Sequence, residues 1–505
     1  MMIRQSLKIQ NISKAYVTVR SATRSYCKSV KRKTIFALSS GHGKCGVSVI
    51  RVSGPDSRTV LCSLTRLKQL PRARSAVLQK IFHPSSGEML DRGLILWFPG
   101  PNSFTGEDCC EFHVHGGPAV VSGVLEAIGS LPDLSPSEAG EFTKRAFQNG
   151  KLDLTEVEGL GDLIHAETEA QRRQALQQMA GDLKQLYQGW STRLTKSLAY
   201  IEAYIDFSED DNIEEGVLDE ADSIVKALQA ELSAHLCDSR RGERLRSGIH
   251  IVIGGATNAG KSSLLNMISQ KPAAIVSPIA GTTRDVVETA LNIGGYPVLL
   301  SDTAGLRESE DPIEQEGMIR ARSKLQEADI VVAVIDSREV SQDLSGICDF
   351  LQKYLKQVIN VDCDENQPGR RRCFILVLNK TDLLEEEIQE GLNRVICQQE
   401  LPSVCLLSCK TGQGFQEFLQ MLQHRITQLC GDPLMGSPSL TQARHRLHLQ
   451  NCEKALEQYH HYRAVDLVVA AEQLRLALQH LGRITGKVGA EEILNIIFRD
   501  FCIGK

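Results

Sequence analysis

The hydrophobic positions follow a strand-like pattern in the first part of the chain. Short apolar runs broken by Gly and Pro, such as GVSVIRVSG, GLILWFPGP and CEFHVHGG, predict strands. An apolar stretch after Pro118 predicts a helix. Residues 35–153 are therefore expected to form a compact α+β domain.

The period of the apolar residues changes after this region. From Leu176 to Ile205 they recur every three or four positions, which predicts one long amphipathic helix. The same period returns from Leu467 to Leu481, and we expect Gly482 to end that helix. Each helix has an apolar stripe that needs a partner, so the two are expected to pack together. They predict an all-α helical domain made of residues 154–246 and 429–505.

Strands and helices alternate between the two helical blocks. This pattern, over residues 247–428, is typical of a parallel α/β sheet. The chain is therefore predicted to be multidomain, with an α/β domain inserted into the helical domain.

Length and composition fit this division. A chain of 505 residues is too long for one core, and 42% apolar with 24% charged residues is ordinary for a globular protein. The net charge of -5 gives no global sign of a nucleic-acid binder, so any RNA or DNA contact has to rest on local patches or on a partner. No apolar run approaches the roughly 20 residues that cross a bilayer.

The first 34 residues differ from the rest in charge. The first acidic residue is Asp56, whereas nine Lys and Arg residues precede Ile35, among frequent Ser and Thr. This composition predicts a mitochondrial transit peptide over residues 1–34 and a matrix location, and a disordered basic tail is the alternative. The 15 cysteines include no Cys-x-x-Cys pair, which favours reduced thiols and argues against a zinc site.

A phosphate-binding loop opens the α/β region. The strand IHIVIGG runs into Gly255-Ala-Thr-Asn-Ala-Gly260-Lys261-Ser262 and then into the helix SSLLNMI. Backbone N–H groups and the helix N-terminus can cradle phosphates there. Lys261 is expected to reach the β and γ oxygens, and the Ser262 hydroxyl is expected to ligate Mg²⁺.

Two further elements follow in the order of a GTPase. In Gly281-Thr282-Thr283-Arg284-Asp285 the second threonine can complete the Mg²⁺ shell and sense the γ-phosphate. The run VLLSDTAG places Asp302 at a strand end with Gly305 three residues later, suited to Mg²⁺ and γ-phosphate contacts. Each element alone is an ordinary turn, but their order and spacing predict a Ras-like P-loop G domain.

The base-reading element follows another strand. Asn379-Lys380-Thr381-Asp382 ends the run CFILVLNKTD, and the carboxylate can accept two hydrogen bonds from guanine, a pattern that adenine does not offer. Ser408-Cys409-Lys410 resembles the Ser-Ala-Lys loop that backs the base, although this triplet alone is a weak signal. The motifs therefore predict binding and hydrolysis of GTP.

The residue that orients the attacking water is not evident from these motifs. Leu306 stands where Ras-like proteins carry a glutamine. An acidic segment follows, and spacing alone does not choose among its members, which are Glu308, Glu310, Asp311, Glu314 and Glu316.

Long stretches of the chain resemble the MnmE (TrmE) family of tRNA-modification GTPases. They include GATNAGKSSLLN, GTTRD, DTAGLRESEDPIEQEG, PNSFTGEDCCEFHVHGG, GEFTKRAFQNGKLDLTEVEGLGDLI and the terminal FCIGK. The resemblance covers nearly the whole chain from Ile35, and the basic N-terminus is similar to that of a mitochondrial member. It departs from the family pattern at Thr257, at residues 137–140 and at residues 41–46.

The resemblance implies a potassium-dependent homodimer of G domains. K⁺ is expected to contact Asn258 and the loop of Ser277, Ile279 and Thr282, and Glu314 is expected to position the water. The implied catalytic residues are Glu314, Lys261 and Thr283. The implied GTP-binding residues are Asn258, Ala259, Gly260, Lys261, Ser262, Ser263, Ser277, Ile279, Thr282, Thr283, Asp302, Thr303, Ala304, Gly305, Asn379, Lys380, Asp382, Ser408, Cys409 and Lys410.

The resemblance also implies a folate site in the N-terminal domain, which is similar to folate-binding aminomethyltransferase domains and dimerises in the family. A 5-formyl-tetrahydrofolate or related one-carbon folate is expected at Arg51, Glu111, Lys151 and Lys505, with the tail Cys502 nearby. From the residues alone, Arg51 and Glu111 are as well explained as an ordinary ion pair, and Cys502 as a free thiol.

Three functions remain open at this point. The resemblance implies a GTPase that works with an MnmG-type FAD- and NADH-using flavoprotein to install a taurinomethyl-type group on carbon 5 of wobble uridine 34 in mitochondrial tRNAs. A mitochondrial ribosome-assembly GTPase is the alternative from the motifs alone. A folate-dependent aminomethyltransferase regulated by GTP is the third.

Overall fold

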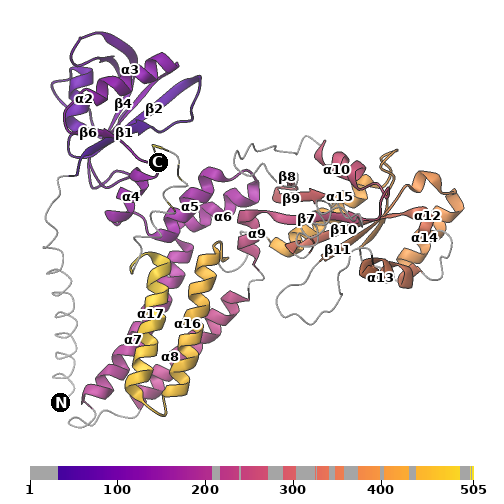
Figure 1. Cartoon of the computed structure of the whole chain (residues 1–505). Helices are drawn as coiled ribbons and strands as arrows, with labels where there is room; N and C mark the ends of the chain where they lie inside the picture. The colour runs from indigo at the N-terminus through magenta and orange to yellow at the C-terminus, as the bar shows by residue number, and fades with distance from the viewer. Residues whose placement is uncertain are drawn as a thin grey trace, which may run out of the picture. The chain divides into compact units, whose positions relative to one another are not determined.

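The chain forms two compact units (Figure 1). One unit contains residues 1–152 with 491–505, and the other contains residues 153–490. In this computed structural model of the 505-residue chain, the described residues are 32–207, 216–237, 240–270, 288–302, 325, 327–340, 347–357, 373–398, 403–431, 439–488, 497, 501 and 503–504.

The first unit is built on a six-stranded sheet. Its strand order is β3-β4-β5-β2-β1-β6, with β1 and β6 parallel and the other neighbours antiparallel. The strands are β1 (Thr34–Leu38), β2 (Cys45–Ser53), β3 (Val77–Phe82), β4 (Met89–Phe98), β5 (Cys109–Gly116) and β6 (Leu134–Pro136). The helices are α2 (Ser57–Thr65), α3 (Pro118–Gly129) and α4 (Glu141–Gln148). The predicted α+β arrangement is confirmed.

Alternation along the strands places the core of this unit. On β5 the side chains of Cys110, Phe112 and Val114 are buried, and they belong to one apolar cluster with residues of α2 and α3. The intervening residues Glu111 and His113 are partly exposed, because successive side chains of a strand point to opposite faces. The sheet therefore has one face covered by helices and one face that carries polar groups.

The end of the chain packs on this sheet. Phe501 is buried, and Ile503 forms a bridge with Ala139. The Ser39 hydroxyl donates to the Gly504 carbonyl at 2.8 Å. Gly504 has a φ of 95°, and a Cβ there would lie 2.1 Å from the Leu38 carbonyl oxygen, so glycine is required at this contact. The tail is thereby fixed beside the end of β1.

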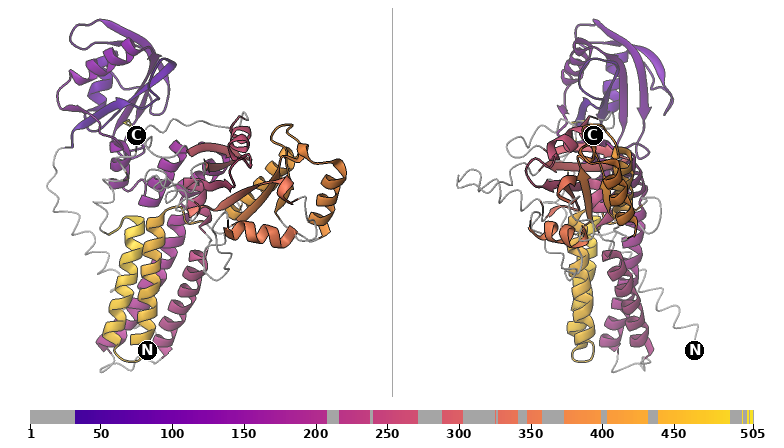
Figure 2. Two further views of the ribbon diagram at one scale, coloured as in Figure 1. Left: turned by 45° about the vertical axis from the view of Figure 1, so that its right-hand side comes forward. Right: turned by 90° about the vertical axis from the view of Figure 1, so that its right-hand side faces the viewer.

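The second unit begins with helices. They are α5 (Leu154–His165), α6 (Glu169–Ala180), α7 (Asp182–Phe207), α8 (Gly216–Leu236), α9 (Arg241–Ser247), α16 (Ala443–Tyr462) and α17 (Leu467–Thr485). Helices α7, α8, α16 and α17 lie side by side (Figures 1 and 2). Leu194 of α7 and Leu474 of α17 share one buried cluster, which confirms that the two predicted apolar stripes pack together.

Two predicted helix boundaries were wrong. The helix predicted from Leu176 to Ile205 is two helices, because Gly181 adopts a left-handed φ of 94° and ends α6. The last helix does not end at Gly482, which is inside α17. It ends at Thr485, with Gly486 as the left-handed cap whose N–H donates to the Gly482 carbonyl. Apolar periodicity continues across both points, so it does not reveal them.

The α/β part of the second unit has a sheet of order β12-β11-β10-β7-β9-β8. The pair β8–β9 is antiparallel and the other pairs are parallel. Its strands are β7 (Ile249–Gly255), β8 (Glu288–Ile293), β9 (Tyr296–Asp302), β10 (Ile330–Asp336), β11 (Cys373–Asn379) and β12 (Val404–Leu406). Its helices are α10 (Lys261–Ser269), α12 (Ser337–Val340), α13 (Ile347–Gln357), the short 3₁₀ helix η2 (Thr381–Leu383), α14 (Glu386–Gln398) and α15 (Phe415–Cys430).

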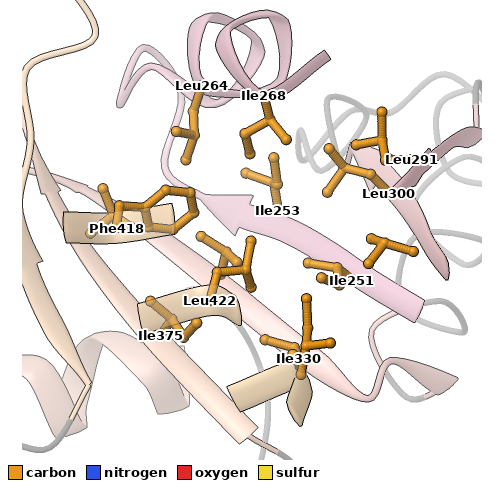
Figure 3. Close-up of a cluster of buried hydrophobic side chains, with 14 of the residues drawn as sticks. Ile251, Ile253, Leu264, Ile268, Leu291, Leu300, Ile330, Ile375, Phe418 and Leu422 are labelled. Carbon is orange, nitrogen blue, oxygen red and sulfur yellow. The ribbon is translucent and has the colours of Figure 1, made fainter. Parts of the chain in front are cut away.

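The α/β core holds β7 in the middle of the sheet. Ile251 and Ile253 of β7 pack with Leu264 of α10 and with Phe418 and Leu422 of α15 (Figure 3). Because β7 has strands on both sides and helices against its side chains, the loop that follows it is rigidly supported. No helix of the described residues is long and apolar enough to cross a membrane.

Candidate functional site

The phosphate-binding loop joins β7 to α10, as predicted. Its backbone uses left-handed conformations, with a φ of 64° at Asn258 and 104° at Gly260. A Cβ at Gly255 would lie 2.2 Å from the Val334 carbonyl oxygen of the neighbouring β10. The turn therefore depends on glycine at both ends of the loop.

Lys261 lies across this loop. Its ammonium donates to the carbonyl oxygens of Gly255 at 3.0 Å and Ala256 at 2.8 Å. Ser262 and Ser263 follow in the first turn of α10, where helix N–H groups lack intrahelical acceptors. A lysine beside a helix N-terminus suits phosphate oxygens, and a serine hydroxyl there suits Mg²⁺. The donor set of the loop therefore fits a nucleotide with its magnesium ion.

Asn379 connects the phosphate loop with the Ser408-Cys409-Lys410 loop. Its side-chain amide donates to the Ala259 carbonyl at 2.8 Å, and its amide oxygen accepts the Cys409 N–H at 3.1 Å. The side chain is 1% exposed, and a Cβ at Gly260 would lie 2.0 Å from its nitrogen. A single buried amide thus fixes the spacing between the phosphate-binding and base-binding loops.

The base-reading residues are oriented by hydrogen bonds. The buried Ser408 hydroxyl donates to Asp382 at 2.6 Å, and the Lys380 ammonium donates to Asp336 at 2.8 Å. Hydrogen bonds from Arg338 and then Lys380 hold the pKa of Asp336 well below its usual range, so this carboxylate is ionised. Burial raises the pKa of the Cys409 thiol to about 11, so it is a neutral thiol in the base loop.

Sequence reasoning missed Tyr354. Its hydroxyl accepts the N–H of Ala256 in the phosphate loop at 2.8 Å and donates to the Val334 carbonyl at 2.9 Å. Burial raises its pKa to about 12, so the hydroxyl keeps its proton at neutral pH. Tyr354 comes from α13, about 100 residues beyond the loop that it holds, and no motif marks it. Asp336 was missed for the same reason.

Part of the predicted site lies outside the described residues. This applies to Ser277, Ile279, Thr282, Thr283, Thr303, Ala304, Gly305 and Glu314. Asp302 is the last residue of β9, and its backbone is in register with Ile253 of β7. It therefore stands at the carboxyl end of the strand beside the one that leads into the phosphate loop, which is where ligands bind in such sheets.

Arg51 and Glu111 are brought together in the first unit. They face each other on β2 and β5, and the Arg51 guanidinium donates to Glu111 at 3.0 Å. Their side chains are only 20% and 16% exposed. The guanidinium carbon lies 5.3 Å from the Phe104 ring centroid and 5.8 Å from that of Phe142. A half-buried charged pair beside aromatic rings fits a flat heterocycle that carries N–H groups.

Lys151 and the tail lie near the same strands. The Lys151 ammonium donates to the Pro101 carbonyl at 3.1 Å, in the segment that also carries Phe104. Gly504 packs against Leu38 of β1. Ala37, which precedes Leu38, is the register partner of Arg51 on β2. Cys502 and Lys505 lie outside the described residues. Arg51 and Glu111 are thus direct neighbours in the sheet, and Lys151 contacts the segment that carries Phe104.

The histidines beside this pair have carboxylate partners. His113 contacts Glu111 at 3.2 Å, and His115 contacts Asp91 at 2.8 Å. No group of three metal-binding side chains occurs among the described residues. The geometry here is that of a charged, hydrogen-bonded strand surface.

Family comparisons match almost the whole chain. A family model described as the GTP-binding protein TrmE N-terminus matches residues 34–151. A second, described as the MnmE helical domain, matches residues 154–502.

Similar proteins match over nearly full length. The mitochondrial 5-taurinomethyluridine tRNA synthase subunit GTPB3 of Danio rerio is 60% identical, covering 94% of this chain and 93% of that protein. The same-named protein of Homo sapiens is 58% identical, covering 94% of this chain and 93% of that protein. The tRNA modification GTPase MnmE of Parvibaculum lavamentivorans is 45% identical over 94% and 100%.

Proposed function

Because the chain belongs to the MnmE (TrmE) family of tRNA-modification GTPases, we propose that it hydrolyses GTP to drive modification of carbon 5 of wobble uridine 34 in mitochondrial tRNAs. The GTPase activity in this proposal is supported above all by the buried Asn379, whose side chain forms hydrogen bonds with both the phosphate loop and the base loop. Relatives that are 56% to 60% identical are named as mitochondrial, which supports a mitochondrial location.

The described residues divide the work on GTP. Lys261 and the N-terminus of α10 hold the phosphates, and Asp382, oriented by Ser408, selects guanine by accepting its N–H groups. Ser262 and Thr283 hold Mg²⁺, which neutralises charge on the phosphates when bound. Lys261 can exchange its two carbonyl contacts for phosphate oxygens, because ammonium is a flexible point charge.

The catalytic step needs a group that orients water. We assign this role to Glu314, and we assign K⁺ to Asn258, Ser277, Ile279 and Thr282 in a dimer of G domains. Substitution Glu314→Ala should lower the GTP hydrolysis rate by roughly 100-fold or more, as for loss of a positioned acid–base group. GTP affinity should stay nearly constant, measured by fluorescent-nucleotide titration. A Glu314→Ala protein with the normal rate would show that another group orients the water.

The N-terminal unit supplies the one-carbon chemistry in this proposal. Arg51 and Glu111, which pair with each other, would hold a formyl-tetrahydrofolate or related folate, and Lys151 would pair with its charged end. We assign Lys505 and Cys502 to the same site. Glu111 can accept hydrogen bonds from a pterin ring, while the exposed Phe104 can provide an apolar contact and the buried Phe142 lies beside the Arg51 guanidinium. The folate is the one-carbon donor when bound.

A second protein completes the reaction. The Danio rerio relative is named a synthase subunit, which supports a complex with an MnmG-type flavoprotein that uses FAD and NADH. The added group is then taurinomethyl.

Mass spectrometry of mitochondrial tRNA nucleosides tests the proposal. Cells without this chain should lose the C5 modification, and the intact chain should restore it, whereas Lys261→Ala should not. Restoration by Cys502→Ser would leave the tail cysteine without a chemical role. An unchanged nucleoside profile in the deletion would instead favour ribosome assembly, and turnover without a flavoprotein would favour an aminomethyltransferase.

A further inference from the structure

The segment from Ser57 to Arg92 is strongly basic although the whole chain has a net charge of -5. It contains two acidic residues, Glu88 and Asp91. Its cations are all exposed, and none of them forms an ion pair among the described residues. They are Arg58, Arg66, Lys68, Arg72, Arg74, Lys80 and Arg92.

Three of these cations gather at the β3–β4 hairpin, and we call Arg66, Lys80 and Arg92 the hairpin cations. Lys80 of β3 and Arg92 of β4 are direct register partners. The Arg66 guanidinium carbon lies 4.1 Å from the centroid of the Phe82 ring, two residues beyond Lys80 on β3. Arg66 also donates to the Gly87 carbonyl in the hairpin turn at 3.1 Å, so its charge is held in place.

The pairing of Lys80 with Arg92 is unfavourable in the protein alone. Residues directly opposite on antiparallel strands have Cβ atoms about 4.5–5.5 Å apart, and like charges there are destabilising. Asp91 forms no ion pair with either cation among the described residues, since its oxygens accept the backbone N–H of His115 and contact the His115 ring Nδ1, both at 2.8 Å. A bound anion would remove the repulsion.

Protection of a sheet edge does not account for the arrangement. β3 is an edge strand, where a lysine prevents pairing with another chain. Arg92, however, lies on β4, which has β3 on one side and β5 on the other. Arg66 lies outside the strands altogether, as the cap that follows α2. Protection of the edge strand from pairing with another chain needs only Lys80, and it explains neither Arg92 nor Arg66.

We propose that the hairpin cations bind the phosphate backbone of RNA, and this rests on the proposed function, which makes tRNA the substrate. A chain with a net negative charge repels a polyanion over most of its surface, so contact requires a local cationic patch. Two of the three hairpin cations are arginines, whose planar guanidinium matches phosphate in a bidentate way. These contacts position the tRNA and do not read its sequence.

Binding of the full-length protein to an unmodified mitochondrial tRNA transcript tests this surface. The double variant Lys80→Gln/Arg92→Gln should bind roughly tenfold more weakly at physiological salt, and the slope of log affinity against log salt should fall by about one to two. Its thermal unfolding temperature should be equal or higher, because the repulsion is gone. The matched control is Arg172→Gln/Arg173→Gln on α6, which removes the same charge from residues paired with Glu169.

The outcomes separate this inference from the proposed function. Equal affinity and equal salt slope in the two double variants would overturn it. So would weaker binding of the Lys80/Arg92 variant to phosphatidylserine vesicles with unchanged tRNA binding, because the surface would then be a lipid contact. If the unaltered chain bound no tRNA and its loss changed no nucleoside, the proposed function itself would fail.

Discussion

The nucleotide site and the Arg51–Glu111 site are held together by different forces. Around the phosphate loop of the nucleotide site, the described contacts are made by backbone carbonyls and amides, glycine turns, the buried Asn379 and the Tyr354 hydroxyl. The Lys380–Asp336 ion pair lies in the base-reading part of that site. In the Arg51–Glu111 site the main contact is a charged pair between two strands, beside aromatic rings. The first is preorganised by the backbone, whereas the second depends on two side chains that neutralise each other.

This difference sets how each site responds to mutation. Removing one partner of a charged pair destabilises the site, because the remaining charge is left partly buried without a counter-charge. A backbone-built loop keeps its shape when an exposed side chain changes. Since the two sites lie in separate compact units, damage to one should leave the other intact.

The largest expected effect is at Lys261. The Lys261→Ala variant should lose more than about 100-fold in GTP affinity, because the loop loses the ammonium charge that it offers to the phosphates. Folate binding should be unchanged, measured by equilibrium dialysis beside a fluorescent-GTP titration. Lys196→Ala, an exposed lysine of α7, is the control. Loss of folate binding in Lys261→Ala would contradict the independence of the two sites.

Glu111→Gln should lower the folate affinity of the Arg51–Glu111 site by about 10- to 100-fold, which is the scale of a lost charge-assisted hydrogen bond. The amide keeps the shape of the carboxylate but leaves Arg51 without its counter-charge. GTP hydrolysis should be unaffected. Glu126→Gln on α3 serves as the matched control, because Glu126 is exposed. Normal folate binding by the Glu111→Gln variant would show that the Arg51–Glu111 pair is not part of the folate site.

Asp382→Asn should change base preference within the nucleotide site. The variant should bind GTP roughly tenfold or more weakly, because an amide cannot accept both guanine N–H bonds. It should gain affinity for xanthosine triphosphate, whose carbonyl replaces the exocyclic amine. Competition titrations with both nucleotides measure the ratio. An unchanged ratio would mean that Asp382 does not read the base.

The smallest expected effect is at Tyr354. Tyr354→Phe leaves the Ala256 N–H without its acceptor and should lower the free energy of unfolding by about 1–2 kcal/mol. The loop support is lost too, so the KM for GTP should rise several-fold. Tyr296→Phe is the control, since its hydroxyl donates to Gly431 in the same unit. If both variants lowered stability and left KM alone, Tyr354 would be structural only.

The sequence predicted the parts of these sites that lie in contiguous motifs. The strand–loop–helix position of the phosphate loop and the strand-end positions of Asp302 and Asn379 were predictable, because these motifs have a fixed local spacing. The roles of these residues in binding GTP stay predictions. The second bond of Asn379 and the hydroxyl of Tyr354 were not predictable, because they join segments about 100 residues apart through packing. Gly181 was missed because a helix cap interrupts the backbone without interrupting the apolar stripe.

The packing of Ile503 on Ala139 and of Gly504 on the end of β1 has a consequence for how the protein is made. The strands up to Gly116 leave the ribosome long before the tail that packs on them. At 5–20 residues per second the delay between Leu152 and Phe501 is roughly 20 to 70 s. During that time the end of β1 at Leu38 and Ser39 lacks the contacts that Gly504 makes with it in the folded chain. The unit that is synthesised first is therefore among the last to be completed. Truncation near the C-terminus should lower the stability of this N-terminal unit.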